Sequence, residues 1–242
     1  MFLLFRSLFA PPRHFILLLA ALWFGLALAE KRAEQHNVSK GTLNNMVYLA
    51  LLGYILGGRL IYALAYFSAF AGSPLSIFSL EPELFEPIGA IMVASLVGIV
   101  YAHRQKLAFW STLDALTPLF ATLAIGLSFA HLAAGTAFGS QTDLPWGVGL
   151  WGAIRHPSQI YELVASSLIF GLIWFHRTES PAGISFLTFS TLTAAARLFL
   201  EAFRGDSTLI LGGLRLAQVL AWMVLAIALF TDETIRKHGI GD

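Results

Sequence analysis

The sequence predicts an all-α integral membrane protein that forms a single polytopic domain over residues 1–242. Hydrophobic residues make up 57% of the chain and charged residues 12%, which is about half the charged share of a soluble domain. The chain contains several apolar stretches, each close in length to the ~20 residues that a helix needs to cross a bilayer. No basic tail, Gly/Ser-rich linker or internal repeat divides the chain. Together these features favour one bundle of transmembrane helices.

Seven stretches are predicted as transmembrane helices. They are His14–Ala29, Leu43–Phe70, Pro87–Ala102, Ser111–Ala134, Pro157–Phe175, Ala182–Phe203 and Leu209–Phe230. The first and third are short, and the fourth contains Asp114 and Pro118 near its start.

The distribution of lysine and arginine predicts that the N-terminus lies outside and the C-terminus in the cytoplasm. In this orientation the inner segments hold eight Lys and Arg residues and the outer segments five, as the positive-inside rule requires. Arg13, the apolar run after it and Ala27–Ala29 also resemble a signal peptide with a cleavage site. Cleavage there would reverse the charge count, so we predict seven spans.

Composition excludes several kinds of chemistry. The chain has no cysteine, so a disulfide, a thiolate metal site and a cysteine nucleophile are ruled out. It has no HExxH motif or cluster of carboxylates, and we expect neither a metal nor a cofactor. The net charge of +1 gives no reason to expect nucleic acid as a partner.

Two arginines fall inside predicted spans, where a charge is costly and usually functional. Arg197 is followed by Glu201 four residues later, on the same helix face. Arg59 has no such partner on its own helix, so we expect it to meet another helix or an anionic ligand. The glycines before it, Gly57 and Gly58, are typical of close helix packing.

The densest polar run in an apolar context is Arg155–Glu162. Pro157 suits the first position of a helix, and the free N–H groups there favour an anion. Arg155 could add a bidentate donor for a phosphate, with Gln159 nearby. The alternative is a capped helix with an interfacial arginine, and the residues leave both open.

Glu201 lies between Arg197 and Arg204 in the sequence. One alternative is a buried ion pair that fixes helix packing. We favour a clamp in which Glu201 orients both arginines toward a phosphate. His131 is either an ordinary interfacial histidine or a general base, for which its pKa range is suitable.

The predicted orientation brings these residues together in the outer half of the membrane. Arg59 lies roughly 24 Å along its helix from Leu43 at 1.5 Å per residue, and Arg197 reaches a similar depth. The other residues placed at this level are Ser128, His131, Arg155, Gln159, Glu162, Glu201 and Arg204.

Four motifs of the sequence resemble, in order and spacing, those of the bacterial prolipoprotein diacylglyceryl transferases. They are Gly57–Tyr62, Thr142–Gly147, Arg155–Glu162 and Arg197–Arg204, and the likeness extends roughly from Phe15 to Phe230. Arg-His-Pro-Ser-Gln-x-Tyr-Glu is the most specific of them. The family is also known for seven helices with the N-terminus outside.

The resemblance implies an activity and a place in the cell. These enzymes move the diacylglyceryl unit of phosphatidylglycerol to the lipobox cysteine of a prolipoprotein, and glycerol-1-phosphate leaves. The expected location is the bacterial inner membrane, with the site facing the outer leaflet. By position, Arg59, Arg155, Gln159, Glu162, Arg197 and Glu201 fall on polar positions of the family's lipid site, and Gly139 falls on its signature glycine.

The sequence departs from the family where the signature reads Arg-x-Gly-Asn-x-x-Asn-x-Glu. Those positions here are Ser128, Ala130, His131, Ala134 and Thr136. Two alternatives follow. A divergent transferase would use His131, or else His14 or Glu86, to take the thiol proton, with Arg59, Arg155 and Arg197 holding the phosphate. Its predicted catalytic residues are His131, Arg197 and Glu201. A catalytically inactive relative would keep the lipid groove and act as a lipid-binding or structural subunit beside other membrane proteins.

Overall fold

The computed structural model describes residues 2–72, 76, 79, 81, 84–175, 180–210 and 212–238. The chain divides into two compact units, one formed by Met1–Arg32 with Leu113–Asp242 and the other by Ala33–Thr112. Whether these units form the single domain expected from the sequence stays a prediction.

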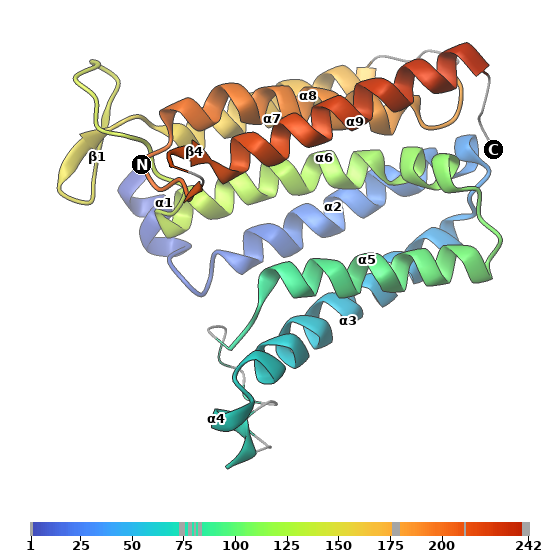
Figure 1. Ribbon diagram of the computed structural model, residues 1–242, viewed down its shortest axis with the longest axis horizontal. Coiled ribbons are helices and arrows are strands. Elements are labelled where there is room, and N and C mark those ends of the chain that lie inside the picture. The colour runs from blue at the N-terminus through green and yellow to red at the C-terminus, as the bar shows by residue number, and fades with distance from the viewer. Residues whose placement is uncertain are drawn as a thin grey trace. The chain divides into compact units, whose positions relative to one another are not determined.

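Long helices that lie side by side build the first unit (Figure 1). Its helices are α1 (Phe2–Leu8), α2 (Phe15–Ala33), α6 (Phe109–Ala134), α7 (Ser158–Phe175), α8 (Ile184–Leu200) and α9 (Leu216–His238). Helix α8 packs against both α7 and α9. Gly126 allows α6 to approach α2, because a Cβ atom at this position would collide with the Ala21 side chain.

Asp114, a charged residue within a predicted transmembrane span, caps the N-terminus of α8. Asp114, in α6, is only 4% exposed. Its two carboxylate oxygens accept hydrogen bonds from the backbone N–H groups of Gly183 at 2.7 Å and Phe186 at 2.8 Å. A carboxylate at a helix N-terminus satisfies free N–H groups and complements the helix dipole. Asp114 is therefore a structural cap.

Two short hairpins complete the first unit. Strands β1 (Val148–Leu150) and β2 (Ala153–Arg155) pair antiparallel with Val148 opposite Arg155. Strands β3 (Leu209–Ile210) and β4 (Leu214–Arg215) pair antiparallel with Leu209 opposite Arg215.

The second hairpin corrects the predicted span Leu209–Phe230, whose start is wrong. Gly212 and Gly213 have φ angles of +81° and +132°, which favour glycine and interrupt a helix. Helix α9 therefore begins at Leu216 and continues to His238.

The second unit is a pair of long helices with short connecting elements. It contains η1 (Glu34–His36), α3 (Lys40–Ala65), α4 (Phe67–Ala71) and α5 (Pro87–Arg104). Gly57 and Gly58 are buried, and a Cβ atom on them would collide with Val93 and Phe85, respectively. The glycines before Arg59 thus serve close packing, as their small size predicts. The predicted span Leu43–Phe70 is wrong at its end, because the helix breaks at Tyr66.

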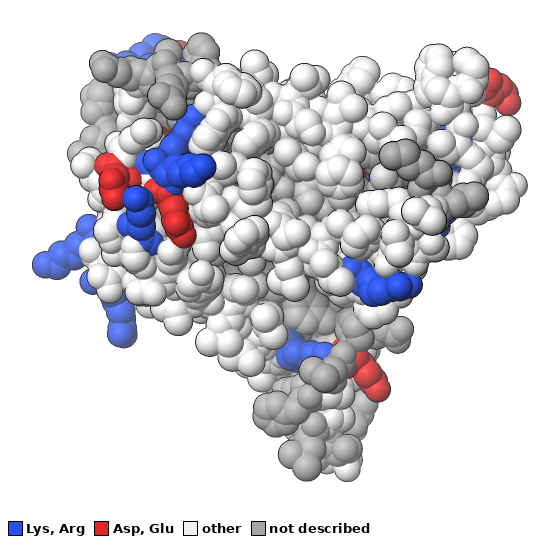
Figure 2. All heavy atoms as spheres, turned by 180° about the vertical axis from the view of Figure 1, so that it is seen from behind, with Lys and Arg blue, Asp and Glu red and all other residues white. Residues whose placement is uncertain are grey.

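Within the described part of the chain, six helices are long and apolar enough to cross a membrane. They are Lys40–Ala65, Pro87–Arg104, Phe109–Ala134, Ser158–Phe175, Ile184–Phe203 and Leu216–Lys237. Helix α2 has 19 residues, but its last turn carries Lys31 and Arg32. The protein is thus a mainly helical multi-pass membrane protein, while the seventh span and the orientation stay predictions. Figure 2 shows how much of one face is uncharged, with acidic and basic side chains gathered in a patch at the left.

Candidate functional site

Glu162, a largely buried carboxylate of α7, contacts three side chains from other elements of the first unit. Glu162 Oε1 accepts hydrogen bonds from Arg197 Nη1 at 2.8 Å and Arg204 Nη1 at 2.9 Å. Its other oxygen, Oε2, lies 3.4 Å from His131 Nδ1. The Glu162 side chain is 12% exposed. We call Glu162, His131, Arg197, Arg204 and Glu201 the ion cluster.

Glu201 does not join both arginines, so that part of the predicted clamp is wrong. Its Oε2 lies 3.0 Å from Arg197 Nη2, as the spacing of four residues predicts. Arg204 instead pairs with Glu162 at 2.9 Å and Asp206 at 2.8 Å. The reason is that α8 ends at Leu200, and the 3-10 turn Glu201–Phe203 redirects the chain before Arg204.

Arg215 is a residue of the site that was not predicted from the sequence. Its Nη1 donates to the backbone oxygen of Glu201, to that of Arg204 at 3.1 Å and to Ser207 Oγ at 3.3 Å. Ser207 Oγ in turn donates to Glu201 Oε1 at 2.6 Å. Arg215 therefore holds the turn that carries two members of the ion cluster. The sequence signal for this hairpin is the pair Gly212 and Gly213, which precedes Arg215.

Replacing Arg215 by methionine is expected to loosen this turn while leaving the apolar stem of the side chain. The change removes hydrogen bonds from a charged donor, each worth about 1.5–3 kcal/mol. We expect a lower melting temperature in detergent. Arg13→Met is the control, because Arg13 donates to Ser7 at an exposed position. Equal melting temperatures of Arg215→Met and the control would contradict the role of Arg215.

The start of α7 holds the loop that follows α6. Ser158 Oγ donates to the Ala137 oxygen at 2.6 Å, and Gln159 Nε2 donates to the Thr136 oxygen at 2.9 Å. Both side chains are buried, with exposures of 1% and 3%. Arg155 donates to the oxygens of Leu150 at 3.1 Å and Gly139 at 3.2 Å. These contacts favour the structural interpretation of the run, and anion binding by Arg155 and Gln159 stays a prediction.

Gly139 lies where the loop meets the ion cluster. It pairs with Arg204 in an isolated β-bridge. A Cβ atom on Gly139 would collide with the backbone oxygen of His156. A glycine is therefore needed for this close backbone approach.

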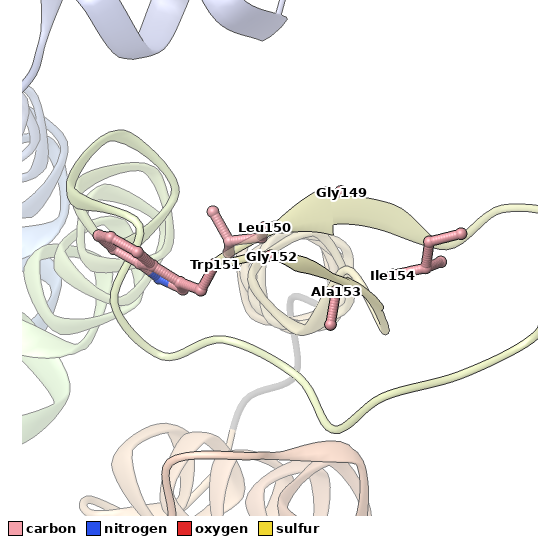
Figure 3. A pocket seen from close by; sticks show the side chains of 6 residues that line it. All are labelled: Gly149, Leu150, Trp151, Gly152, Ala153 and Ile154. Atoms are coloured by element: carbon pink, nitrogen blue, oxygen red, sulfur yellow. The ribbon is translucent and has the colours of Figure 1, made fainter.

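The β1–β2 hairpin is held by two indole N–H groups. Trp146 Nε1 donates to the Tyr161 hydroxyl at 2.8 Å, and Trp151 Nε1 donates to the Gly135 oxygen at 3.0 Å. A shallow pocket follows the hairpin from Gly149 to Ile154, with Trp151 and Ile154 pointing to opposite ends (Figure 3). Both indole rings are more than half exposed, as is typical of aromatic residues at a membrane interface.

An apolar cavity of about 140 Å³ opens beside the ion cluster, between α6, α7 and α8. Its apolar lining includes Leu127, Ile169 and Phe189, and His131, Glu162 and Arg197 lie in the same wall. The cavity is therefore amphipathic. Ser128, Thr193 and Ser166 add hydroxyl groups to it.

The contacts of two predicted site residues, Ser128 and Arg59, say less about ligand binding. Ser128 lines the cavity, but its hydroxyl donates to the Ala124 oxygen at 3.1 Å in its own helix. Arg59 belongs to the second unit, where its Nη1 donates to Ser79 Oγ at 3.4 Å. Its expected contact with an anionic ligand stays a prediction. Among the described residues no group of three His, Cys, Asp or Glu side chains could hold a metal.

The helices and the amphipathic cavity define a multi-pass membrane protein with a charged site built between its helices. The chain belongs to the family described as prolipoprotein diacylglyceryl transferase, whose family model matches residues 13–231. This confirms the resemblance found in the sequence motifs.

The curated relatives share this family over most of their length. The chain is 30% identical to the phosphatidylglycerol–prolipoprotein diacylglyceryl transferase of Geobacter sulfurreducens, over 81% of this chain and 79% of that protein. It is 31% identical to the protein of the same name in Bordetella parapertussis, over 86% of this chain and 88% of the relative. A third relative of that name, from Acaryochloris marina, is 27% identical over 88% of this chain and 82% of its own.

Proposed function

We propose that the protein transfers the diacylglyceryl group of phosphatidylglycerol to the cysteine thiol of a prolipoprotein. The observation that carries the proposal is the ion cluster in the wall of an apolar cavity between membrane helices. This amphipathic arrangement fits a phospholipid, which has an anionic head and apolar chains. The names of the relatives identify the substrates of the proposed reaction.

Arg197 is the residue best placed to bind the lipid phosphate. Its side chain is 35% exposed, compared with 11% for Arg204. Glu162 Oε1 accepts a hydrogen bond from its Nη1 at 2.8 Å, and Glu201 Oε2 forms an ion pair with its Nη2 at 3.0 Å. A guanidinium has five N–H donors, so donors remain for a phosphate. A fixed cation at this point would stabilise the charge that develops on the leaving phosphate.

The proposed reaction is a substitution at the glyceryl carbon that bears the phosphate. A sulfur–carbon bond forms, the bond from that carbon to the phosphate oxygen breaks, and its electron pair stays on the departing glycerol phosphate. His131 accepts the thiol proton, and Glu162, 3.4 Å from His131 Nδ1, stabilises the imidazolium that results. The substrate supplies the thiol, so the enzyme needs no cysteine of its own.

The proposal extends to the place of the reaction. The site faces the outer leaflet of the bacterial inner membrane, where secreted prolipoproteins become accessible. Arg155, Gln159 and Gly139 complete the lipid-binding part of the site by their family positions, and Ser128 lines its cavity. Arg59, in the second unit, is proposed separately as a contact for anionic lipid. The proposed partners of the protein are phosphatidylglycerol, other membrane lipids, prolipoproteins and further membrane subunits.

Replacing His131 by glutamine should slow the chemical step while leaving lipid binding intact. Glutamine can still form a hydrogen bond with Glu162, but it cannot accept the thiol proton. Loss of a general base typically costs about 10²–10⁴-fold in rate. We expect that loss in kcat, measured as peptide lipidation, with KM for the lipid little changed. An unchanged kcat would assign proton transfer to another group.

Complementation in cells tests the proposed function itself. In a bacterial strain depleted of its own transferase, expression of this chain should restore lipidation of a reporter lipoprotein. Failure to restore it, with the protein present in the membrane at normal levels, would contradict the proposal.

A further inference from the structure

Thr193 lies in α8 one turn before Arg197, on the same helix face. It lines the apolar cavity together with members of the ion cluster. Its hydroxyl oxygen is buried and has no hydrogen-bond partner within the part of the chain that the structure describes. Leaving a buried hydroxyl without a partner costs free energy, so this position needs an explanation.

The other hydroxyl groups in the cavity wall are already bonded within their own helices. Ser128 Oγ donates to the Ala124 oxygen at 3.1 Å, and Ser166 Oγ donates to the Leu163 oxygen at 3.1 Å. Thr193 differs from both. A threonine in a helix has two accessible χ1 rotamers, so its hydroxyl can turn toward a ligand in the cavity. The Thr193 hydroxyl is thus an available hydrogen-bond donor at a defined position along α8.

The order of side chains along α8 matches the order of groups in a diacyl phospholipid. Phe189, Thr193 and Arg197 follow one another at intervals of four residues and all line the cavity. Each step of four residues is slightly more than one helical turn and rises ~6 Å along the helix. A phosphate bound to Arg197 would therefore bring the glycerol ester groups to the level of Thr193 and the acyl chains to Phe189.

We propose that Thr193 donates a hydrogen bond to an ester carbonyl of the bound lipid and thereby selects ester-linked over ether-linked phospholipids. An ether-linked lipid has no carbonyl oxygen and would leave the hydroxyl without a partner. This inference rests on the proposed function, because it places a phospholipid in the cavity with its phosphate at Arg197.

The test compares two synthetic phosphatidylglycerols that have the same chains, one linked by esters and the other by ethers. Transfer to a lipobox peptide is measured for the wild type, Thr193→Val, Thr193→Ser and Thr191→Val. Valine keeps the shape and removes the donor, and serine restores the donor. Thr191 is the matched control, because it lies in the same helix and does not line the cavity.

We expect the wild type to favour the ester-linked lipid by about 2- to 10-fold in kcat/KM, the size of one hydrogen bond. Thr193→Val should lose this preference, while Thr193→Ser and Thr191→Val should keep it. An undiminished preference in Thr193→Val would overturn the inference.

The same comparison separates a failure of this inference from a failure of the proposed function. If the wild type transfers neither lipid, the transferase proposal fails. The contribution of Thr193 is then read from competition of the two lipids for the purified protein, measured by native mass spectrometry. The same pattern among the variants would support the hydrogen bond, and equal retention in all of them would overturn it.

Discussion

Replacing Arg197 by alanine is expected to reduce diacylglyceryl transfer by about 10²–10³-fold, the cost of removing one preorganised electrostatic donor from an active site. Arg197 contacts Glu162 at 2.8 Å and Glu201 at 3.0 Å, and it also lines the cavity. The change removes the cation proposed to meet the lipid phosphate. The measurement is the initial rate of peptide lipidation with phosphatidylglycerol as donor.

Two further variants make the Arg197 result specific. Arg197→Lys keeps a positive charge but cannot contact two carboxylates through one planar fork, so we expect partial activity. Arg236→Ala is the matched control, because Arg236 is 55% exposed and pairs with Asp232 in α9. Transfer at the wild-type rate in Arg197→Ala would rule out the proposed role of this residue.

The second large effect is expected from Glu162→Gln. Glutamine cannot neutralise Arg197 and Arg204, and it cannot stabilise a protonated His131. Removing one partner of a largely desolvated charge pair is destabilising, and Glu162 contacts all three neighbours. We expect about a 100-fold loss of kcat, because the general base loses its supporting charge.

A matched substitution separates this effect from a general loss of charge. Glu233 pairs with Lys237 at an exposed position of α9, so Glu233→Gln should retain full activity. The melting temperature of Glu162→Gln in detergent shows whether the variant is folded. A folded Glu162→Gln with wild-type kcat would show that the ion cluster does not support the reaction.

The membrane helices could be predicted because their signal is local. Apolar runs and charged ends placed α5, α6, α7 and α8 within a few residues of their observed bounds. The signal failed at Leu209–Arg215, where the residues are as apolar as a span but Gly212 and Gly213 turn the chain into a hairpin. Hydropathy alone does not register such backbone conformations.

The candidate site could be predicted only where partners share a helix. The pairing of Arg197 with Glu201 followed from their spacing. The joining of Arg197, Arg204 and His131 at Glu162 depends on how α6, α7 and the end of α8 pack together. Spacing along the chain contains no information about that. The same limit hid Arg215, which reaches the site from another element.

The most direct test of the central claim is a transfer assay with the purified full chain. Phosphatidylglycerol in liposomes is mixed with a lipobox peptide, and the peptide mass and the released glycerol phosphate are followed together, with Arg197→Ala as the inactive control. The account predicts a mass gain equal to one diacylglyceryl group, with an equal amount of glycerol phosphate released. An unmodified peptide, from protein that still retains phosphatidylglycerol, would contradict the account and indicate a lipid-binding relative without the transferase activity.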